Sequence, residues 1–467
     1  MTSTDSNGAY TSLSRTHRLD DAPPHRTKIV ILGGGFGGVL TARHLERLCK
    51  GRPEVEITLA SRDNFLVMTP LLFEVCSGAL DPRHCSFPIR AFLRTTRFVE
   101  AAVQHVDPQH QVVQITDGSE TAELPYDQLV IALGSMTNRK MIPGSEHAFT
   151  FKTLADAFVL RNHIIERFER ADAERNPALK RRQLTFVIIG GGLVGVELFG
   201  ELTAFADGIT RWYPHVSRDE VRFILLEGGD RIMPEIDANL AAYGTKVLSQ
   251  RHGAEIRTGT RVQEIEPGKV HLPGETIDAA TIVLAAGILP SPVLASLLVE
   301  RDRRGRIVVD GTMRCQGHPN IWALGDCAAI PSPNGQLYPS LAQHAMREAK
   351  VLARNIVAVL DGQPTKPFVY TTLGMMGSLG HYRAFGKLLH ARVRGFPAWF
   401  IRRTYYLLQM PGWRRRLRIM ADWTFALFFG PDIVKVSLES EEAEASRFAA
   451  AAAESTPAPD YSSVHSE

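Results

Sequence analysis

The chain has 467 residues, which is long enough for two or three domains with sizeable hydrophobic cores. Its 44% hydrophobic and 22% charged residues are ordinary for a globular protein, and a net charge of +3 disfavours nucleic acid as the principal partner. The five cysteines show neither zinc spacing nor a disulfide framework, which predicts a reducing cytoplasm and no metal site. No apolar stretch reaches the roughly 18–20 residues of a membrane-spanning helix.

The two ends of the chain differ from the rest in composition. Residues 1–26 are polar and lack the apolar core of a signal peptide, and residues 438–467 form an acidic and then alanine-rich tail. Neither segment has the apolar pattern needed to build a core. We therefore expect a disordered leader and a disordered tail.

The first motif is a glycine fingerprint, Gly33-Gly34-Gly35-Phe36-Gly37-Gly38, directly after an apolar run at residues 28–32. The pattern G-x-G-x-x-G between a strand and a helix is typical of a dinucleotide-binding unit. Its glycines permit a tight turn, close approach of a pyrophosphate to the backbone, and close packing of helix on strand. The free N–H groups of the helix start then face the phosphates. A purely structural glycine turn is the alternative for one fingerprint alone.

Two strand ends follow in this part of the chain. The strand at residues 56–60 leads into Ser61, at the place where an acid usually holds a ribose hydroxyl, and a serine can also hydrogen-bond a ribose. The strand at residues 126–135 ends in small residues, among them Ala132 and Gly134, which let a cofactor approach the backbone closely. Both strand ends are therefore predicted parts of the first dinucleotide site.

A second fingerprint, Gly190-Gly191-Gly192-Leu193-Val194-Gly195, follows the apolar run at residues 184–189. Glu227 ends the next strand, where a carboxylate accepts both ribose hydroxyls and repels a 2′-phosphate, which favours NADH over NADPH. A solvent-facing glutamate at a strand end is the alternative. A further buried strand ends in Ala286 and Gly287. Two fingerprints in one chain indicate two dinucleotides, and hence electron transfer between them.

Two motifs precede the C-terminal part of the chain. An apolar strand at residues 320–328 carries Asp326 at its end, where the carboxylate is placed to hydrogen-bond a polyol, while Cys327 is expected to be a small packing residue. Ser340 and Gln343 begin a helix with an apolar stripe. Their spacing fits a capping box, in which the glutamine only closes the helix start.

Residues 381–437 carry eleven basic and only two acidic residues, a net charge of +9, interleaved with many aromatic residues. This mixture is typical of an amphipathic segment that lies among anionic lipid headgroups. A dimerisation or core-covering subdomain is the alternative. Nucleic-acid binding is disfavoured, because no nucleic-acid-binding motif accompanies the segment.

Together these strings resemble the type II NADH dehydrogenases (NADH:quinone oxidoreductases) of the FAD-dependent pyridine nucleotide-disulfide oxidoreductase superfamily, over residues 27–437. The resemblance rests on both fingerprints and on three shorter strings: Thr69-Pro70-Leu71-Leu72, Gly325-Asp326-Cys327-Ala328 and Ala342-Gln343-His344-Ala345. The redox-active C-x-x-x-x-C of the disulfide reductases is missing. Arg347 and Glu348 stand where the family has a second glutamine.

The resemblance implies an α/β fold with two Rossmann-like, glutathione-reductase-like domains and a C-terminal amphipathic membrane-associating segment. The implied domains are a leader (1–26), a first FAD-binding part (27–150), an NADH-binding domain (151–290), a second FAD-binding part (291–380), a membrane-interface segment (381–437) and a tail (438–467).

The resemblance also implies which residues contact each cofactor. Those assigned to FAD are Gly33, Gly35, Phe36, Gly37, Gly38, Ser61, Arg62, Thr69, Ala132, Gly134, Asp326 and Gln343. Those assigned to NADH are Gly190, Gly192, Leu193, Val194, Gly195, Glu197, Glu227, Ala286 and Gly287.

Two residues are implied to act in catalysis. Gln343 would lie where the flavin, nicotinamide and quinone sites converge, at a helix start whose N–H groups and dipole stabilise negative charge on the flavin. Glu201 would lie near the nicotinamide, one helical turn after Glu197. For either glutamate, a solvated charge on the helix surface is the alternative.

The implied function is hydride transfer from NADH to FAD and then electron transfer to a membrane quinone, without proton pumping, in a respiratory chain. The implied location is peripheral (monotopic), on the cytoplasmic face of the cell membrane, and a homodimer is one expected assembly. Three alternatives stay open: a soluble NAD(P)H-dependent FAD reductase with another acceptor, a sulfide:quinone-type enzyme, and an NADH-responsive flavoprotein binding module.

Overall fold

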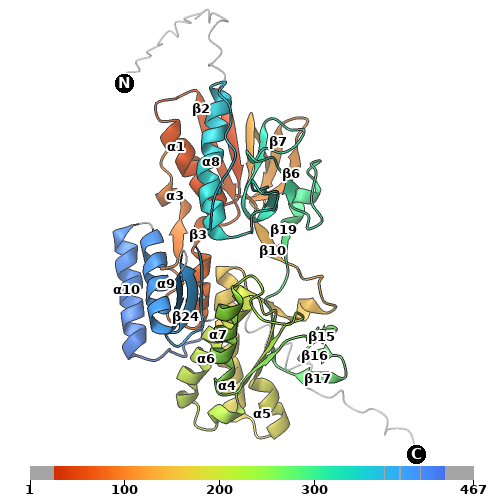
Figure 1. Cartoon of the computed structure of the whole chain (residues 1–467), viewed down its shortest axis with the longest axis vertical. Helices are drawn as coiled ribbons and strands as arrows, with labels where there is room; N and C mark the ends of the chain where they lie inside the picture. Colours follow the sequence, from red (N-terminus) through yellow and green to blue (C-terminus); the bar gives the residue numbers. More distant parts are fainter. Residues whose placement is uncertain (1–25, 373, 389–390, 411, 437–467) are drawn as a thin grey trace, which may run out of the picture. The chain divides into compact units, whose positions relative to one another are not determined.

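The computed structural model describes residues 26–372, 374–388, 391–410 and 412–436 (Figure 1). Apart from Arg26, the predicted leader lies outside the described residues, and so does the predicted tail. The chain forms two compact units. Among the described residues, the first contains those up to Leu66, Pro88–Ser135 and Pro290–Tyr370, and the second contains Val67–Phe87, Met136–Leu289 and those from Thr371 onward. The domains predicted from the sequence divide the chain according to which cofactor each part binds, and this division remains a prediction.

A five-stranded parallel sheet, in the order β21-β9-β1-β2-β5, forms the centre of the first unit. Its strands are short apolar runs with their central residues buried, as expected for a sheet covered on both faces. Helices α1 and α8 pack against each other (Figure 1). The bounds are β1 (Thr27–Leu32), β2 (Val55–Ser61), β5 (Arg97–Glu100), β9 (Gln128–Ile131), β21 (Ile321–Ala323), α1 (Phe36–Leu48) and α8 (Ala342–Leu360).

The rest of the first unit consists of smaller elements. A three-stranded antiparallel sheet contains β6, β7 and β8, and β20 pairs with β22. The bounds are α3 (Ile89–Phe92), β6 (Ala102–Asp107), β7 (Val112–Thr116), β8 (Thr121–Pro125), β20 (Ile307–Val308), η6 (Gly325–Cys327) and β22 (Ala328–Ala329).

The second unit repeats the same plan with a parallel sheet in the order β11-β18-β12-β13-β14. Helices α4 and α5 precede the second fingerprint in the chain. The bounds are β11 (Phe149–Thr150), α4 (Leu154–Ala173), α5 (Pro177–Gln183), β12 (Thr185–Ile189), α6 (Leu193–Ile209), β13 (Arg222–Leu226), α7 (Ala238–Ser249), β14 (Ala254–Arg257) and β18 (Thr281–Leu284).

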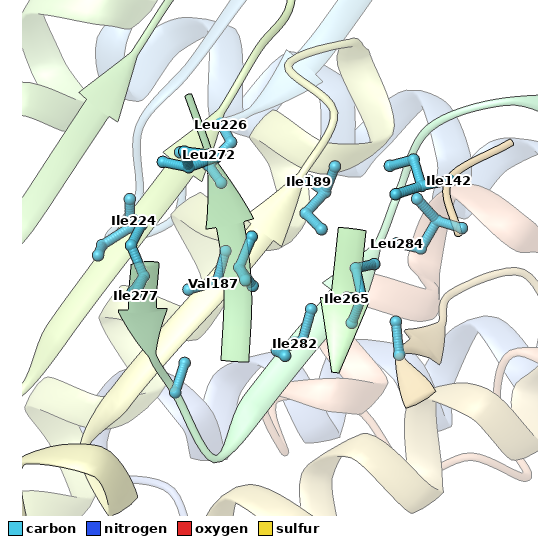
Figure 2. Packing of buried hydrophobic residues seen from close by; sticks show 13 residues of the cluster. Ile142, Val187, Ile189, Ile224, Leu226, Ile265, Leu272, Ile277, Ile282 and Leu284 are labelled. Atoms are coloured by element: carbon cyan, nitrogen blue, oxygen red, sulfur yellow. The ribbon is translucent and has the colours of Figure 1, made fainter. Parts of the chain in front are cut away.

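One face of this sheet is buried against a three-stranded antiparallel sheet (Figure 2). Alternate residues of a strand point to the same face, so Val187 and Ile189 of β12 lie in one cluster with Ile265 and Ile277 of the smaller sheet. The smaller sheet contains β15 (Glu264–Glu266), β16 (Lys269–Leu272) and β17 (Glu275–Asp278).

The C-terminal part of the second unit is an antiparallel sheet followed by two helices. This sheet has the order β23-β24-β25, and α9 packs against it. Among the described helices, none combines the length and apolar character that a bilayer crossing requires. The bounds are α2 (Leu72–Cys76), β23 (Gly374–Ser378), β24 (Ala384–Leu388), β25 (Ala391–Arg394), α9 (Gly395–Gln409) and α10 (Trp413–Phe428).

Candidate functional site: two dinucleotide loops and a buried charge cluster

The first fingerprint forms the turn between β1 and α1. Gly33 has a φ of +110°, and a Cβ there would collide with the carbonyl of Ala132. A Cβ at Gly38 would collide with the carbonyl of Gly33, so only glycine allows this helix to pack so closely. At Gly35, by contrast, an added Cβ would meet nothing within 4 Å. Since α1 begins at Phe36, this open side lies at a helix N-terminus, where phosphates bind.

Three residues assigned to FAD have defined local contacts in the first unit. Ser61 is buried, and its hydroxyl packs so close to Gly34 that a Cβ there would collide with it. Asp326 accepts a hydrogen bond from the Ser135 hydroxyl at 2.6 Å. Arg62 is exposed and pairs with Asp63 at 3.1 Å.

The start of α8 differs from a capping box. The N-cap is Leu341 rather than Ser340, and no side chain of the N-cap residue closes the helix, so the capping alternative for Gln343 does not form. The Gln343 amide oxygen instead accepts from the Tyr370 hydroxyl at 3.2 Å, and Arg347 lies over the Tyr370 ring at 4.5 Å from its centroid. Tyr370 was missed by the sequence analysis, because no motif marks it.

A small depression lies beside this helix start. It is lined by Gly325, Ala328 and Ile330, by residues 338–341, and by Glu348, whose Oε2 accepts from the Gly325 N–H at 2.9 Å. Because Gly325 has a φ of +72°, the turn can present its N–H to that carboxyl.

The second fingerprint repeats the geometry of the first. Gly190 has a φ of +112°, and a Cβ at Gly195 would collide with the carbonyl of Gly190. Helix α6 begins at Leu193, so the last residues of the fingerprint are already helical. Val194 is 42% exposed. Ala286 packs beside Gly190, and Gly287 has a φ of +70°.

Two carboxylates contact the backbone of this second loop. Glu227 Oε2 accepts from the Gly191 N–H at 2.6 Å, and its Oε1 accepts from the Gly229 N–H at 2.6 Å. Glu235 Oε1 accepts from the Leu193 N–H at 2.6 Å. Glu227 is therefore at the loop, as predicted, and is not a remote surface charge. Glu235 was missed by the sequence analysis.

Glu197 and Glu201 are not solvated helix charges, because their side chains are buried in the second unit. Glu197 Oε1 accepts from the Ser378 N–H at 2.7 Å and from Arg402 at 3.0 Å. Glu201 Oε1 accepts from the Ser378 hydroxyl at 2.7 Å. Burial raises the pKa of Glu197 to about 7 although Arg402 opposes the shift, and it also raises the pKa of Glu201.

A third buried acid, Glu74 of α2, completes what we call the buried charge cluster: Glu74, Glu197, Glu201, Arg402 and Arg403. Glu74 accepts from Arg402 at 3.3 Å, from Arg403 at 3.4 Å and from the Trp423 indole N–H at 2.5 Å. No sequence motif marks Glu74 as a site residue. Its position in the otherwise apolar run of residues 71–76 is the signal, since a lone charge in such a run needs a buried partner.

Thr69 belongs to the second unit. It opens the turn η1 (Thr69–Leu71), directly before α2. The neighbouring Pro70 carbonyl accepts from Arg402 at 2.8 Å, which ties this turn to α9.

Comparison with known proteins identifies the family. The family model described as pyridine nucleotide-disulphide oxidoreductase matches residues 27–349. This chain belongs to that family. The chain is 31% identical over 417 residues to the probable NADH dehydrogenase of Dictyostelium discoideum, covering 87% of this chain and 90% of that protein. It is 30% identical over 422 residues to the type II NADH:quinone oxidoreductase Ndh of Mycobacterium tuberculosis, covering 86% and 88%.

Solved structures agree at the level of the fold. NDH2 of Plasmodium falciparum in complex with NADH has a TM-score of 0.80 at 19% identity, covering 88% of this chain and 100% of that one. The sulfide:quinone oxidoreductase of Aquifex aeolicus has a TM-score of 0.65 at 19% identity, covering 88% and 96%. The predicted resemblance to type II NADH dehydrogenases and the predicted α/β class with two Rossmann-like units are confirmed.

Within this pyridine nucleotide-disulphide oxidoreductase, the cysteines are not placed for redox chemistry. All five are free and buried. Burial raises the pKa of Cys85 and Cys327 to about 12 and raises that of Cys315 as well, so these thiols stay protonated near neutral pH. Among the described residues, no group of His, Cys, Asp or Glu could hold a metal ion.

FAD is the flavin of this family, and the first unit fits it. The test is steric: the turn tolerates no side chain at Gly33 or Gly38, yet it leaves the side of Gly35 open. A diphosphate needs this combination of a tight turn and an accessible backbone. NADH fits the second loop by the same criterion, because Gly190 and Gly195 are equally constrained.

Proposed function

We propose that this protein oxidises NADH and reduces a quinone through one FAD, without pumping protons. The observation that carries the proposal is that each compact unit contains a glycine loop whose first and last glycines leave no room for a side chain. Relatives named as type II NADH:quinone oxidoreductases, and a relative named demethylphylloquinone reductase NdbB in Synechocystis, support a quinone acceptor. When bound, FAD accepts the hydride and passes the electrons on, while the protein supplies position and field.

In the first unit, we assign the diphosphate to the loop of residues 33–38 and a ribose hydroxyl to Ser61. Asp326 would accept from the ribityl chain, and its hydrogen bond from Ser135 keeps it oriented. Negative charge on the reduced cofactor would be stabilised by the N-terminus of α8, which has 19 residues and a correspondingly well-aligned dipole. Gln343 lies at this N-terminus.

In the second unit, we assign the adenosine ribose of NADH to Glu227. Its two oxygens, which now accept from Gly191 and Gly229, would accept from both ribose hydroxyls. This carboxylate would repel the 2′-phosphate of NADPH, so NADH is the expected donor. We also propose that Glu201 contacts the nicotinamide. The Ser378 hydroxyl holds the Glu201 carboxyl in one orientation.

The direct test is a titration followed by visible absorbance. The full-length protein is reconstituted with FAD, then titrated anaerobically with NADH and afterwards with a short-chain quinone. We expect yellow absorbance that bleaches with NADH and returns with quinone. Folded protein that stays colourless after reconstitution would overturn the proposal. Bleaching without recovery by any quinone would support an NADH-responsive binding module instead.

Type II NADH dehydrogenases are peripheral membrane enzymes, and we propose that α9 and α10 form the contact with the bilayer on its cytoplasmic face. Both helices expose large apolar side chains: Phe396, Phe400 and Leu408 on α9, and Trp413, Leu417, Phe425 and Phe428 on α10. Arg414 and Arg418 of α10 are also exposed. Aromatic residues with arginines suit the headgroup region of anionic lipids. A homodimer through these helices is the competing use of the same surface.

A further inference from the structure

Residues 229–237, which we call the rim loop, lie directly against the second fingerprint. The Met233 N–H donates to the Gly191 carbonyl at 2.6 Å, and both Ile232 and Met233 are buried. An added Cβ at Gly191 would lie only 2.9 Å from the Ile232 side chain. The rim loop is therefore a fixed part of the NADH loop.

The conformation of the rim loop is held by its own side chains. The Arg231 guanidinium donates to the carbonyls of Pro234 at 2.8 Å and Ile236 at 3.1 Å. Met233 has a φ of +52°, which is unfavourable for a residue with a side chain and persists only where the surroundings enforce it. Asp237 then caps the start of α7. The backbone that carries Glu235 is thus fixed on both sides.

This fixed turn aims an exposed carboxylate at the start of α6. Glu235 Oε1 accepts from the Leu193 N–H at 2.6 Å. Leu193 is the first residue of a 17-residue helix, so its N–H has no partner within the helix. This N–H lies at the positive end of the helix dipole. A dinucleotide diphosphate binds at this same position. The carboxylate of Glu235 therefore stands where the phosphate would bind.

The first unit shows no such carboxylate among its described residues. Its fingerprint has the same turn and helix start, but within the described part of the chain no carboxylate accepts from the backbone of residues 33–38. Ser61 replaces the strand-end acid there. Among the described residues, no carboxylate contacts the backbone of the loop assigned to FAD, whereas Glu227 and Glu235 both accept from the backbone of the loop assigned to NADH. This matches a cofactor that stays bound and a substrate that must leave in every turnover.

We propose that Glu235 competes with the NADH diphosphate for the start of α6. This inference rests on the proposed function. The Glu235 carboxylate must leave the Leu193 N–H before the phosphate binds, so it weakens binding of NADH and NAD⁺ and speeds product release. When only a fraction of the protein is in the binding-competent state, the apparent affinity for the ligand is reduced in proportion to that fraction. One anion at a helix N-terminus gives an effect of about twofold to fivefold.

The test measures NAD⁺ binding to the full-length, FAD-loaded protein by titration calorimetry. We expect Glu235→Ala to bind NAD⁺ about twofold to fivefold more tightly than the wild type, with slower NAD⁺ dissociation in stopped flow. Glu235→Gln, which keeps the length but loses the charge, should change in the same direction and by less. Adenosine, which has no phosphate, should bind all three proteins equally.

Glu264→Gln is the matched control, because it removes one exposed negative charge from β15 of the same unit without touching the loop. NAD⁺ binding that is unchanged or weaker in Glu235→Ala would overturn the inference, and so would an equal gain in Glu264→Gln. A wild-type protein that binds FAD but neither NAD⁺ nor NADH would instead overturn the proposed function. The two failures are therefore distinguishable.

Discussion

At the scale of single residues, the second unit concentrates charge where solvent is excluded. The buried charge cluster contains three carboxyl groups and two guanidinium groups, so full ionisation would leave one negative charge unpaired. Burial raises the pKa of Glu197 and Glu201, which favours retention of a proton in the cluster. Arg402 is the central member, because it contacts Glu74, Glu197 and the Pro70 carbonyl.

Removing that central arginine should be costly. Arg402→Met leaves Glu74 and Glu197 buried without their main counterion, and we expect the free energy of unfolding to fall by about 3–5 kcal/mol. Arg392→Met is the control, since Arg392 pairs with Asp237 at 2.9 Å on the surface and should cost less than about 1 kcal/mol. Urea titration of both variants measures the difference. Equal midpoints would contradict the assigned role of the cluster.

Gln343 allows a kinetic test at the same scale. Gln343→Ala removes the acceptor of the Tyr370 hydroxyl, and we expect quinone reduction to slow roughly fivefold, the value of one neutral hydrogen bond. Reduction of the bound flavin by NADH should be nearly unchanged. Stopped-flow absorbance separates the two half-reactions, and Gln109→Ala, an exposed glutamine of the same unit, serves as the control. Equal loss in both half-reactions would refute the role.

At the scale of elements, α9 and α10 serve two purposes at once. Their inner side chains, Arg402, Arg403 and Trp423, enter the buried charge cluster, while their outer side chains are apolar and exposed. Deleting everything after Tyr382 would therefore remove the arginine partners of Glu74 and Glu197. Such a truncation would test folding and membrane binding together, so surface substitutions are the sharper experiment.

The double variant Phe425→Ser and Phe428→Ser changes two side chains of α10 that are 64% and 78% exposed. We expect it to fold normally and to lose most of its flotation with anionic liposomes, because each phenylalanine contributes up to about 1.5–3 kcal/mol when buried in lipid. Leu298→Ser, at 74% exposure in the first unit, is the control. Undiminished flotation would contradict the lipid contact. A wild-type dimer that the double variant dissociates would assign the surface to self-association.

At the scale of the whole molecule, the sequence predicted the repeated plan well, because strand, glycine turn and helix are local patterns. The sheets, both fingerprints and the place of Glu227 follow from such patterns. Glu74, Glu235 and Tyr370 did not, since each acts through a partner far along the chain or through a turn with no sequence signature. Glu197 and Glu201 look like surface charges in sequence, and elements far along the chain, α9 and β23 among them, pack over these side chains.

The pH dependence of the fold depends on such buried acids. Glu348 is 2% exposed, and burial raises its pKa to about 7, opposed by the Gly325 N–H and reinforced by the charge of Asp326. Between its ordinary pKa of 4.5 and about 7, the folded protein thus holds a proton on Glu348 that the unfolded chain has lost. The free energy of unfolding must then fall as the pH rises through this window.

Glu348→Gln should remove this contribution, because an amide cannot ionise while its oxygen can still accept from the Gly325 N–H. We expect the variant to match the wild type near pH 5 and to exceed it near pH 8 by on the order of 2–3 kcal/mol, from about 1.4 kcal/mol per pKa unit. Glu197 titrates in the same direction in both proteins, so their difference isolates Glu348. Thermal unfolding across this pH range measures it, with Glu264→Gln as the exposed control. Parallel curves for variant and wild type would show that Glu348 keeps its ordinary pKa in the folded protein.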